Sequence, residues 1–302
     1  APVELAAGQT ATVAATGSAQ DLVPWWPRIP GTPAGLPGAS APKLYTLRAM
    51  VVANDDRVID VLDDAFGYRE VTIEGTGLYV NGRRVNFRSL ISGAGRTIEE
   101  TFANWRAARC NTLRLPHTGW NDHFTRDRQR ATVRYADKHG IAVRFNSQIN
   151  GMFIDLATGS PAFWHNATDY WRKVVKAYRN HPSILVWTGE NELDLISNMA
   201  GHKGFKEREW EMIKVAHEVD PSRPVMADGA GDLLGHCEIC NWHYPEVGPI
   251  ADPNDRRAVR QRAQEGVGLY PANAYSLKRR SHRNAVQRPW DRKRPLWIGE
   301  TY

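Results

Sequence analysis

The sequence predicts an α/β protein whose main part is a barrel of parallel strands surrounded by helices. Short apolar segments alternate with amphipathic helical segments from about residue 74 to the last residue, 302. This alternation is typical of parallel α/β folds. Polar residues also stand at the C-terminal ends of several predicted strands, which is where parallel barrels gather their functional groups.

The first 73 residues have a different pattern, dominated by short β-strands. Pro and Gly are frequent between residues 24 and 42, which are therefore predicted to form a loop. The strands are too few for a complete sandwich, so we expect residues 1–73 to be part of a β-sandwich domain and residues 74–302 to be the barrel domain. The predicted strands of the first domain cover 3–5, 10–13, 44–51 and 57–62.

Local signals set the helix boundaries in the barrel. Thr97 with Glu100 forms a capping box, and the helix that it opens places Phe102 and Trp105 on one face. A second helix ends at Gly140, because glycine readily takes the left-handed conformation found after helix C-termini. Further helices are predicted over 167–178 and through Trp210, Ile213 and Ala216.

Seven strands alternate with these helices. A closed eight-stranded barrel would need one more strand and helix, so we expect the barrel to be truncated after its seventh strand. The predicted strands cover 85–88, 111–115, 141–145, 184–187, 223–227, 239–244 and 295–300.

Composition excludes several classes of function. No apolar run approaches the ~20 residues that are needed to cross a bilayer, so no membrane partner is predicted. Cys237 and Cys240 form a single CxxC pair without a second pair or a histidine cluster at zinc spacing. We therefore predict no metal and no other cofactor.

The net charge of +6 is concentrated in one segment. Between Glu246 and Arg294, twelve Lys and Arg residues stand against five Asp and Glu, which leaves the rest of the chain at −1. A solvated loop explains this charge, and attraction of an anionic substrate is the functional alternative. Nucleic-acid binding is not predicted, because it would rest on charge alone.

The polar residues at the strand ends form a chemically coherent set. Two glutamates on separate strands, flanked by Arg, His, Tyr and Asn, suit glycoside cleavage with retention of configuration, which needs two carboxyl groups ~5 Å apart. Charge inside a barrel wall is costly, so a role in strand packing does not explain these residues. They are Arg114, His117, Asn191, Glu192, His243, Tyr244 and Glu300.

The sequence resembles family 2 of the glycoside hydrolases, within the clan of retaining (β/α)8 TIM barrels that includes β-galactosidases, β-mannosidases and β-glucuronidases. The resemblance implies that the preceding sandwich is immunoglobulin-like. The motifs that carry it are Leu44-Tyr45, Gly67-Tyr68-Arg69, Tyr79-Val80-Asn81-Gly82, Asn111 to His117, Ala136 to Ile141, His181-Pro182-Ser183, Trp187, Asn191-Glu192 and Glu300.

The resemblance implies a role for each residue of the site. Glu192 would be the general acid/base and Glu300 the nucleophile. Arg114 and Tyr244 would orient Glu300 and keep it ionised, and Asn191 would bind the sugar 2-hydroxyl. The remaining predicted substrate-binding residues are His117, His243 and Trp187.

Three interpretations of function stay open at this point. The first is an exo-acting retaining β-glycosidase whose partner is a carbohydrate, either neutral or anionic such as a uronic acid or sulfated sugar. The second is an endo-β-glycanase of the same clan, and the third is a catalytically silent sugar-binding or scaffold protein. Glu190 lies either near the site or in an ion pair outside it.

Overall fold

A parallel sheet forms the centre of the protein. The structure is a computed structural model that describes residues 2–29, 32–89, 97–115, 126–199, 204–229, 231–243 and 290–300. Four parallel strands pair in chain order, and two further strands form a second parallel pair. The four are β6 (Thr112–Leu115), β7 (Ala142–Asn146), β8 (Ile184–Thr188) and β9 (Val225–Met226), and the pair is β10 (Cys240–His243) with β11 (Leu296–Glu300).

The chain order of the parallel strands confirms the predicted α/β class. Within the described ranges no hydrogen-bonded strand pairing joins the β6–β9 sheet to the β10–β11 pair, so the barrel is not closed. The carboxyl ends of the strands nevertheless meet in one region, because neighbouring strands are parallel. Of the polar residues that the sequence placed at the strand ends, this region contains Arg114, Asn191, Glu192, His243 and Glu300.

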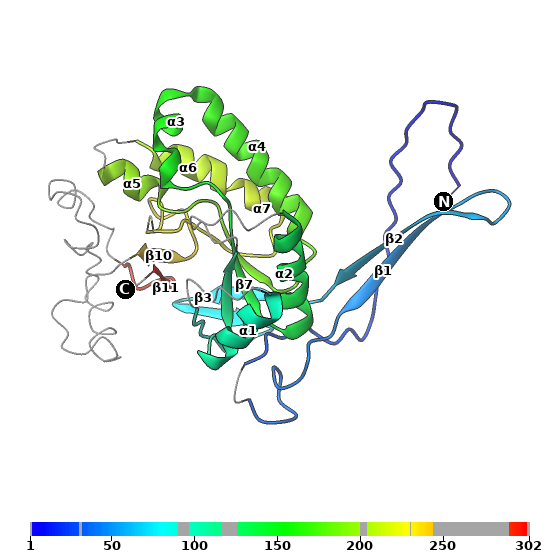
Figure 1. Ribbon diagram of the computed structural model, residues 1–302, viewed down its shortest axis with the longest axis horizontal. Coiled ribbons are helices and arrows are strands. Elements are labelled where there is room, and N and C mark those ends of the chain that lie inside the picture. Colours follow the sequence, from blue (N-terminus) through cyan, green and yellow to red (C-terminus); the bar gives the residue numbers. More distant parts are fainter. Residues whose placement is uncertain are drawn as a thin grey trace.

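Helices pack on the outer side of the parallel sheet (Figure 1). The predicted capping signal is confirmed, because Glu100 N donates to Thr97 Oγ1 at 3.1 Å. Gly140 follows the second helix with a φ of 71°, as expected for its left-handed conformation. The helices are α1 (Ile98–Ala107), α2 (Arg126–His139), α3 (Ile154–Gly159), α4 (Pro161–Tyr178), α5 (Leu193–Met199), α6 (Lys206–Ile213) and α7 (Val215–Val219), with a 3₁₀ turn η1 (Gly151–Phe153) before α3.

The hydrophobic core has two parts on either side of the parallel strands. The first lies between strands and helices, and its large side chains include Phe102, Phe145, Trp171 and Trp187. The second contains Trp25 and side chains of a three-stranded antiparallel sheet, together with inner residues of the parallel strands. That antiparallel sheet consists of β3 (Val71–Glu74), β4 (Gly77–Val80) and β5 (Arg83–Val85).

The predicted parallel strand over 85–88 is wrong. Its first residue ends β5, which pairs antiparallel with β4. The turn at Asn81 and Gly82 has positive φ at both residues, 49° and 73°. Two consecutive left-handed residues make a tight hairpin turn, so the following strand folds back onto its predecessor.

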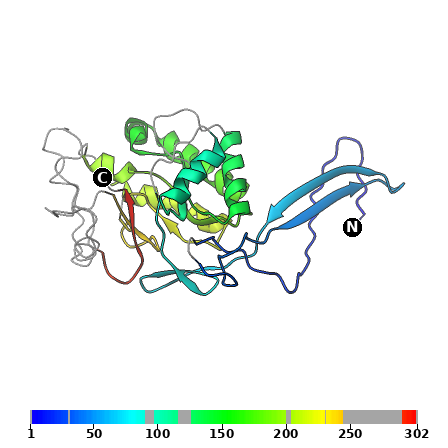
Figure 2. The ribbon, with the colours of Figure 1, turned by 60° about the horizontal axis from the view of Figure 1, so that its bottom comes forward.

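A long hairpin of β1 (Tyr45–Val52) and β2 (Val58–Phe66) extends away from the rest of the molecule (Figures 1 and 2). Side chains on both of its faces are exposed, including Leu47 on one face and Met50 on the other. The predicted strands over 3–5 and 10–13 are not formed. The immunoglobulin-like sandwich is therefore not confirmed, and the domain boundary at residue 73 stays a prediction.

The segment before the hairpin is attached to the barrel through a tryptophan. Trp25 is fully buried, and its indole N–H donates to the carbonyl oxygen of Asp137 at 2.8 Å. Part of the predicted loop over 24–42 is thus packed against the α2 end of the barrel. None of the helices in the described ranges is long and apolar enough to cross a membrane.

Candidate active site

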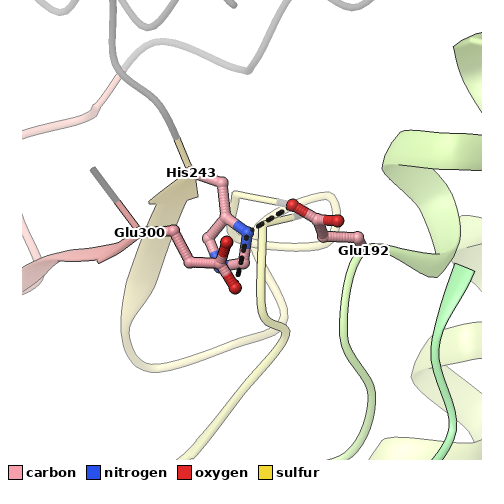
Figure 3. Close-up of side chains that lie close together, drawn as sticks. All are labelled: Glu192, His243 and Glu300. Atoms are coloured by element: carbon pink, nitrogen blue, oxygen red, sulfur yellow. Dashed lines mark hydrogen bonds and ion pairs between the residues drawn. The ribbon is translucent and has the colours of Figure 1, made fainter. Parts of the chain in front are cut away.

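Three ionisable side chains meet at the carboxyl ends of the strands (Figure 3). Glu192 follows β8 and precedes α5, His243 ends β10, and Glu300 ends β11. One carboxylate oxygen of each glutamate and a ring nitrogen of His243 all lie within 4.8 Å of one another. His243 Nδ1 lies 2.7 Å from Glu192 Oε1 and 3.8 Å from Glu300 Oε1. The two predicted catalytic glutamates are thus brought together.

Arg114 connects Glu300 to the rest of the site. It lies in β6, and its guanidinium donates to Glu300 Oε1 and to Asn191 Oδ1. A third contact joins Arg114 Nη2 to Asp228 Oδ2 at 2.8 Å. The arginine is almost fully buried, whereas the side chains of Glu192 and Glu300 are 16% and 12% exposed. The carboxylates therefore face the open side, with the arginine behind them.

Asp228 is the centre of the buried charge network. It follows β9 and is fully buried. Its Oδ1 accepts from Arg144 at 2.9 Å and faces His243 Nε2 at 2.8 Å, while its Oδ2 accepts from Asn146 at 2.6 Å and faces Arg114. Burial favours the neutral acid, but Arg114, Arg144 and His243 outweigh it and hold the pKa of Asp228 well below its usual range.

His243 is held as a cation between two carboxylates. Burial acts against its charge, but Asp228 and then Glu192 outweigh this effect and raise the pKa of His243 to about 9. Both ring nitrogens therefore carry protons at neutral pH, and each donates to a carboxylate oxygen. This doubly bonded imidazolium fixes the position of the Glu192 carboxyl group.

A divalent metal is a second way to explain three such groups. Glu192, His243 and Glu300 offer ligand atoms close enough to share an ion. However, histidine binds metals as neutral imidazole, and the raised pKa and the two carboxylate partners of His243 favour the protonated ring. Charge pairing among the side chains themselves accounts for the cluster.

The structure brings together five of the eight predicted site residues, and one prediction needs correction. His117 and Tyr244 lie outside the described residues. Trp187 is fully buried on the helix side of β8, where it contacts Trp171 and donates its indole N–H to Asp220 at 2.8 Å. It has no access to the open side of the site, so the predicted substrate contact is wrong. The five that meet are Arg114, Asn191, Glu192, His243 and Glu300.

Asp228, Asn146 and Arg144 were missed by the sequence analysis. Asp228 and Asn146 directly follow predicted strands, so the strand-end criterion that found Glu192 would have found them as well. Arg144 stands inside a strand, where a charge is costly unless it is paired. Its partner Asp228 is 84 residues away in the sequence, and no local pattern indicates that pairing.

Gly299 allows β11 to lie directly against His243. A Cβ at this position would lie 2.5 Å from His243 Nε2 and 2.7 Å from Asn241 Oδ1. Replacing Gly299 by Ala is therefore expected to displace Glu300 and reduce any turnover that depends on it by ~10²-fold, the cost of a ~1 Å misplacement. Gly17→Ala is the control for introducing a Cβ, because Gly17 is exposed, does not have a left-handed φ and has open space where the Cβ would lie. A Gly299→Ala variant with unchanged kinetics would show that the contact is not needed.

The fold and the site together define a class of protein. They consist of parallel strands with helices outside and two carboxylates on separate strand ends, which is an arrangement suited to glycoside cleavage. Residues 132–255 match the family described as glycosyl hydrolases family 2, TIM barrel domain. The predicted resemblance to family 2 is thereby confirmed over these residues, which are less than half of the chain, and the match agrees with the mixed α/β fold.

Other proteins are similar to the chain in sequence or in fold. Over 236 residues the chain is 25% identical to β-galactosidase BgaC of Bifidobacterium adolescentis, covering 71% of this chain and 20% of that protein. A family 2 β-galacturonidase from Eisenbergiella tayi, solved with galacturonate, has a TM-score of 0.62 at 18% identity, covering 93% of this chain and 44% of that one. For Bifidobacterium dentium β-glucuronidase the TM-score is 0.57 at 19% identity, with coverage of 82% and 40%. The chain thus spans a fifth of the curated relative and less than half of each of these two solved chains.

Proposed function

We propose that the protein is a retaining β-glycosidase that removes terminal sugars by double displacement. The observation that carries this proposal is the separation of the two carboxyl groups, whose facing oxygens lie within 4.8 Å. Retaining enzymes need ~5–5.5 Å between the carboxyl groups, whereas inverting enzymes need ~6.5–9.5 Å to admit a water molecule. The short separation supports direct attack by one carboxylate on the anomeric carbon.

Glu300 is the proposed nucleophile. Arg114, which is almost fully buried, donates to its carboxylate, and the positive charge favours the ionised form that attack requires. Attack of a Glu300 oxygen on the anomeric carbon breaks the glycosidic bond and forms a glycosyl ester. Glu192 protonates the departing oxygen, and it then takes a proton from the water molecule that hydrolyses the ester.

Asn191 and His243 have supporting roles in this mechanism. Asn191 Oδ1 accepts from Arg114, so the amide nitrogen is the atom with which Asn191 would donate to the sugar 2-hydroxyl. His243 is fully buried and donates to Glu192, which makes it a support of the acid/base group. The sequence analysis had placed His243 in contact with the sugar, and its burial argues against that role.

The sugar is the open part of the proposal. The relatives include a β-galactosidase, a β-galacturonidase and a β-glucuronidase. In the described part of the site the cations Arg114, Arg144 and His243 are each paired with carboxylates. A uronic acid would therefore need a further cation, and the basic segment between Glu246 and Arg294 is the sequence feature that could supply it. Named activities of these relatives support exo-action over the endo-glycanase alternative.

The test is a panel of 4-nitrophenyl β-glycosides that includes galactoside, glucoside, mannoside, glucuronide and galacturonide. Release of nitrophenol from one neutral or one uronic member, with the β-anomer of the free sugar formed first in proton NMR, is the expected result. Formation of the α-anomer first would rule out retention. Sugar binding without turnover across the panel would favour the silent sugar-binding interpretation.

A further inference from the structure

A second pair of glutamates lies behind the site, formed by Glu190 and Glu209. Both side chains are fully buried, so neither can touch a substrate. Glu190 stands two residues before Glu192, and Glu209 lies in α6. The mechanism above does not use either of them.

Glu190 binds two backbone N–H groups next to the acid/base residue. Its Oε2 accepts from Leu193 N at 2.7 Å, and its Oε1 accepts from Asp228 N at 2.6 Å. The N–H of Glu192 itself donates to the carbonyl oxygen of Asp228 at 2.7 Å. The peptide N–H groups on both sides of the Glu192 α-carbon are thus held, one by Asp228 and one by Glu190.

This support matters because the backbone of Glu192 is in an unfavourable conformation. Its φ is +57°, in the left-handed region that residues with a Cβ seldom adopt. Without its hydrogen-bond partners the residue would relax toward ordinary helical or extended angles, and the carboxyl group would turn away. His243 holds the carboxyl end of the same side chain at 2.7 Å. Glu190 therefore holds the backbone at Glu192, and His243 holds its carboxyl group.

Glu209 stabilises the buried negative charge of Glu190. The two buried carboxyl groups interact with each other, and two adjacent carboxylates would repel unless one of them held a proton. In the described part of the chain, no donor group hydrogen bonds to either carboxyl oxygen of Glu209. The proton therefore resides on Glu209, whose O–H donates to Glu190, leaving both Glu190 oxygens to accept from the backbone. Burial, first of all, raises the pKa of both groups, but the two backbone N–H groups lower the pKa of Glu190, so Glu209 is the group that keeps the proton.

We propose that Glu190 is a positioning residue that holds the left-handed backbone of Glu192 and thereby aims the acid/base carboxyl group, while the carboxylic acid of Glu209 holds Glu190. The proposal rests on the function proposed above for Glu192. It assigns the role that the sequence analysis left open for Glu190, between a place in the site and an ion pair outside it.

Replacing Glu by Gln is predicted to have different effects on activity at Glu190 and at Glu209. In Glu190→Gln an NH₂ group replaces one acceptor oxygen and faces a backbone N–H, so the hold on Glu192 is lost. In Glu209→Gln the NH₂ group replaces the O–H and still donates to Glu190. We expect Glu190→Gln to lower kcat for a phenyl β-glycoside by ~10²-fold with little change in KM, and Glu209→Gln to stay within ~3-fold of wild type.

Comparing two leaving groups distinguishes a misplaced Glu192 carboxyl group from a general disturbance of the active site. A phenolate leaves poorly and needs a proton from Glu192, whereas a 2,4-dinitrophenolate leaves without one. The loss in Glu190→Gln should therefore be at least ~10-fold smaller with the dinitrophenyl glycoside. Equal losses with both leaving groups, or a Glu209→Gln variant as impaired as Glu190→Gln, would overturn the proposal.

Two measurements do not depend on turnover. The infrared difference spectrum of the wild type minus Glu209→Gln should contain a protonated carboxylic acid band at neutral pH, and absence of that band would contradict the proton on Glu209. A crystal structure of Glu190→Gln should show Glu192 outside the left-handed region, and an unchanged φ would contradict the positioning role. If wild type cleaves no glycoside, the proposed function fails, while these two results still decide whether the pair holds Glu192.

Discussion

Replacing Glu300 by Gln is expected to lower kcat for an aryl β-glycoside by ~10⁴-fold or more, because the variant has no nucleophile. Gln has the shape of Glu, and its amide oxygen can still accept from Arg114, so the fold should persist. The measurement is steady-state kinetics on the glycoside that the wild type cleaves best, together with a thermal melt of both proteins.

A matched control for this variant is Glu218→Gln. Glu218 is an exposed glutamate that pairs with Arg172 at 2.9 Å, and the same chemical change there should leave the kinetics unaltered. Turnover by Glu300→Gln at the wild-type rate would contradict the nucleophile assignment. An equal loss in both variants would point to damage that is unrelated to the site.

Replacing Asp228 by Ala is expected to lower the free energy of unfolding by about 3–5 kcal/mol, because it leaves buried cations without their partner. Arg114, Arg144 and His243 each contact Asp228 within 2.9 Å. Urea denaturation followed by tryptophan fluorescence measures the loss. Activity should fall with it, because Arg114 and His243 hold Glu300 and Glu192 respectively.

Asp63→Ala is the control for the buried position of Asp228. Asp63 also pairs with an arginine, Arg48, at 2.8 Å, but on the exposed hairpin. Exposed pairs are screened by water, so this variant should keep nearly all of its stability. A loss for Asp228→Ala no larger than that for Asp63→Ala would show that the buried network contributes little.

The pH dependence of stability provides a second readout for Asp228. The pKa of His243 is raised from 6.5 to about 9, so between these values the native state binds more protons than the unfolded state. The His243 contribution to stability is therefore complete below pH 6.5 and is lost as the pH rises through about 9. Asp228 is the main cause of the raised pKa of His243. The stability of the Asp228→Ala variant should therefore depend much less on pH in this range.

Much of the site could be predicted from the sequence because strand ends are local features. A short apolar run that leads directly into polar residues marks both the strand and the position of its side chains, as at Asn191-Glu192 and at Glu300. Parallel pairing then brings these ends together without further information. The same criterion extends to Asp228, which the analysis overlooked.

The remaining features depend on contacts that no local pattern records. Trp187 was assigned to the wrong side of its strand, because a fully buried strand is apolar on both faces and its sequence does not show which face meets the helices. The strand predicted over 85–88 was assigned to the wrong sheet, because the tight turn at Asn81-Gly82 pairs it with β4 instead. The pairing of Glu190 with Glu209 requires the packing of α6 against the end of β8.

The central claim, that Glu300 attacks the sugar and forms a covalent ester, can be tested directly by labelling. The wild-type enzyme would be incubated with a 2-deoxy-2-fluoro β-glycoside of the preferred sugar, which slows hydrolysis of the ester, and then analysed by intact and peptide mass spectrometry. The account predicts one added fluoroglycosyl group on the peptide that contains Glu300, and none in Glu300→Gln. A label on Glu192, or efficient turnover of the ordinary substrate without any labelling, would contradict it.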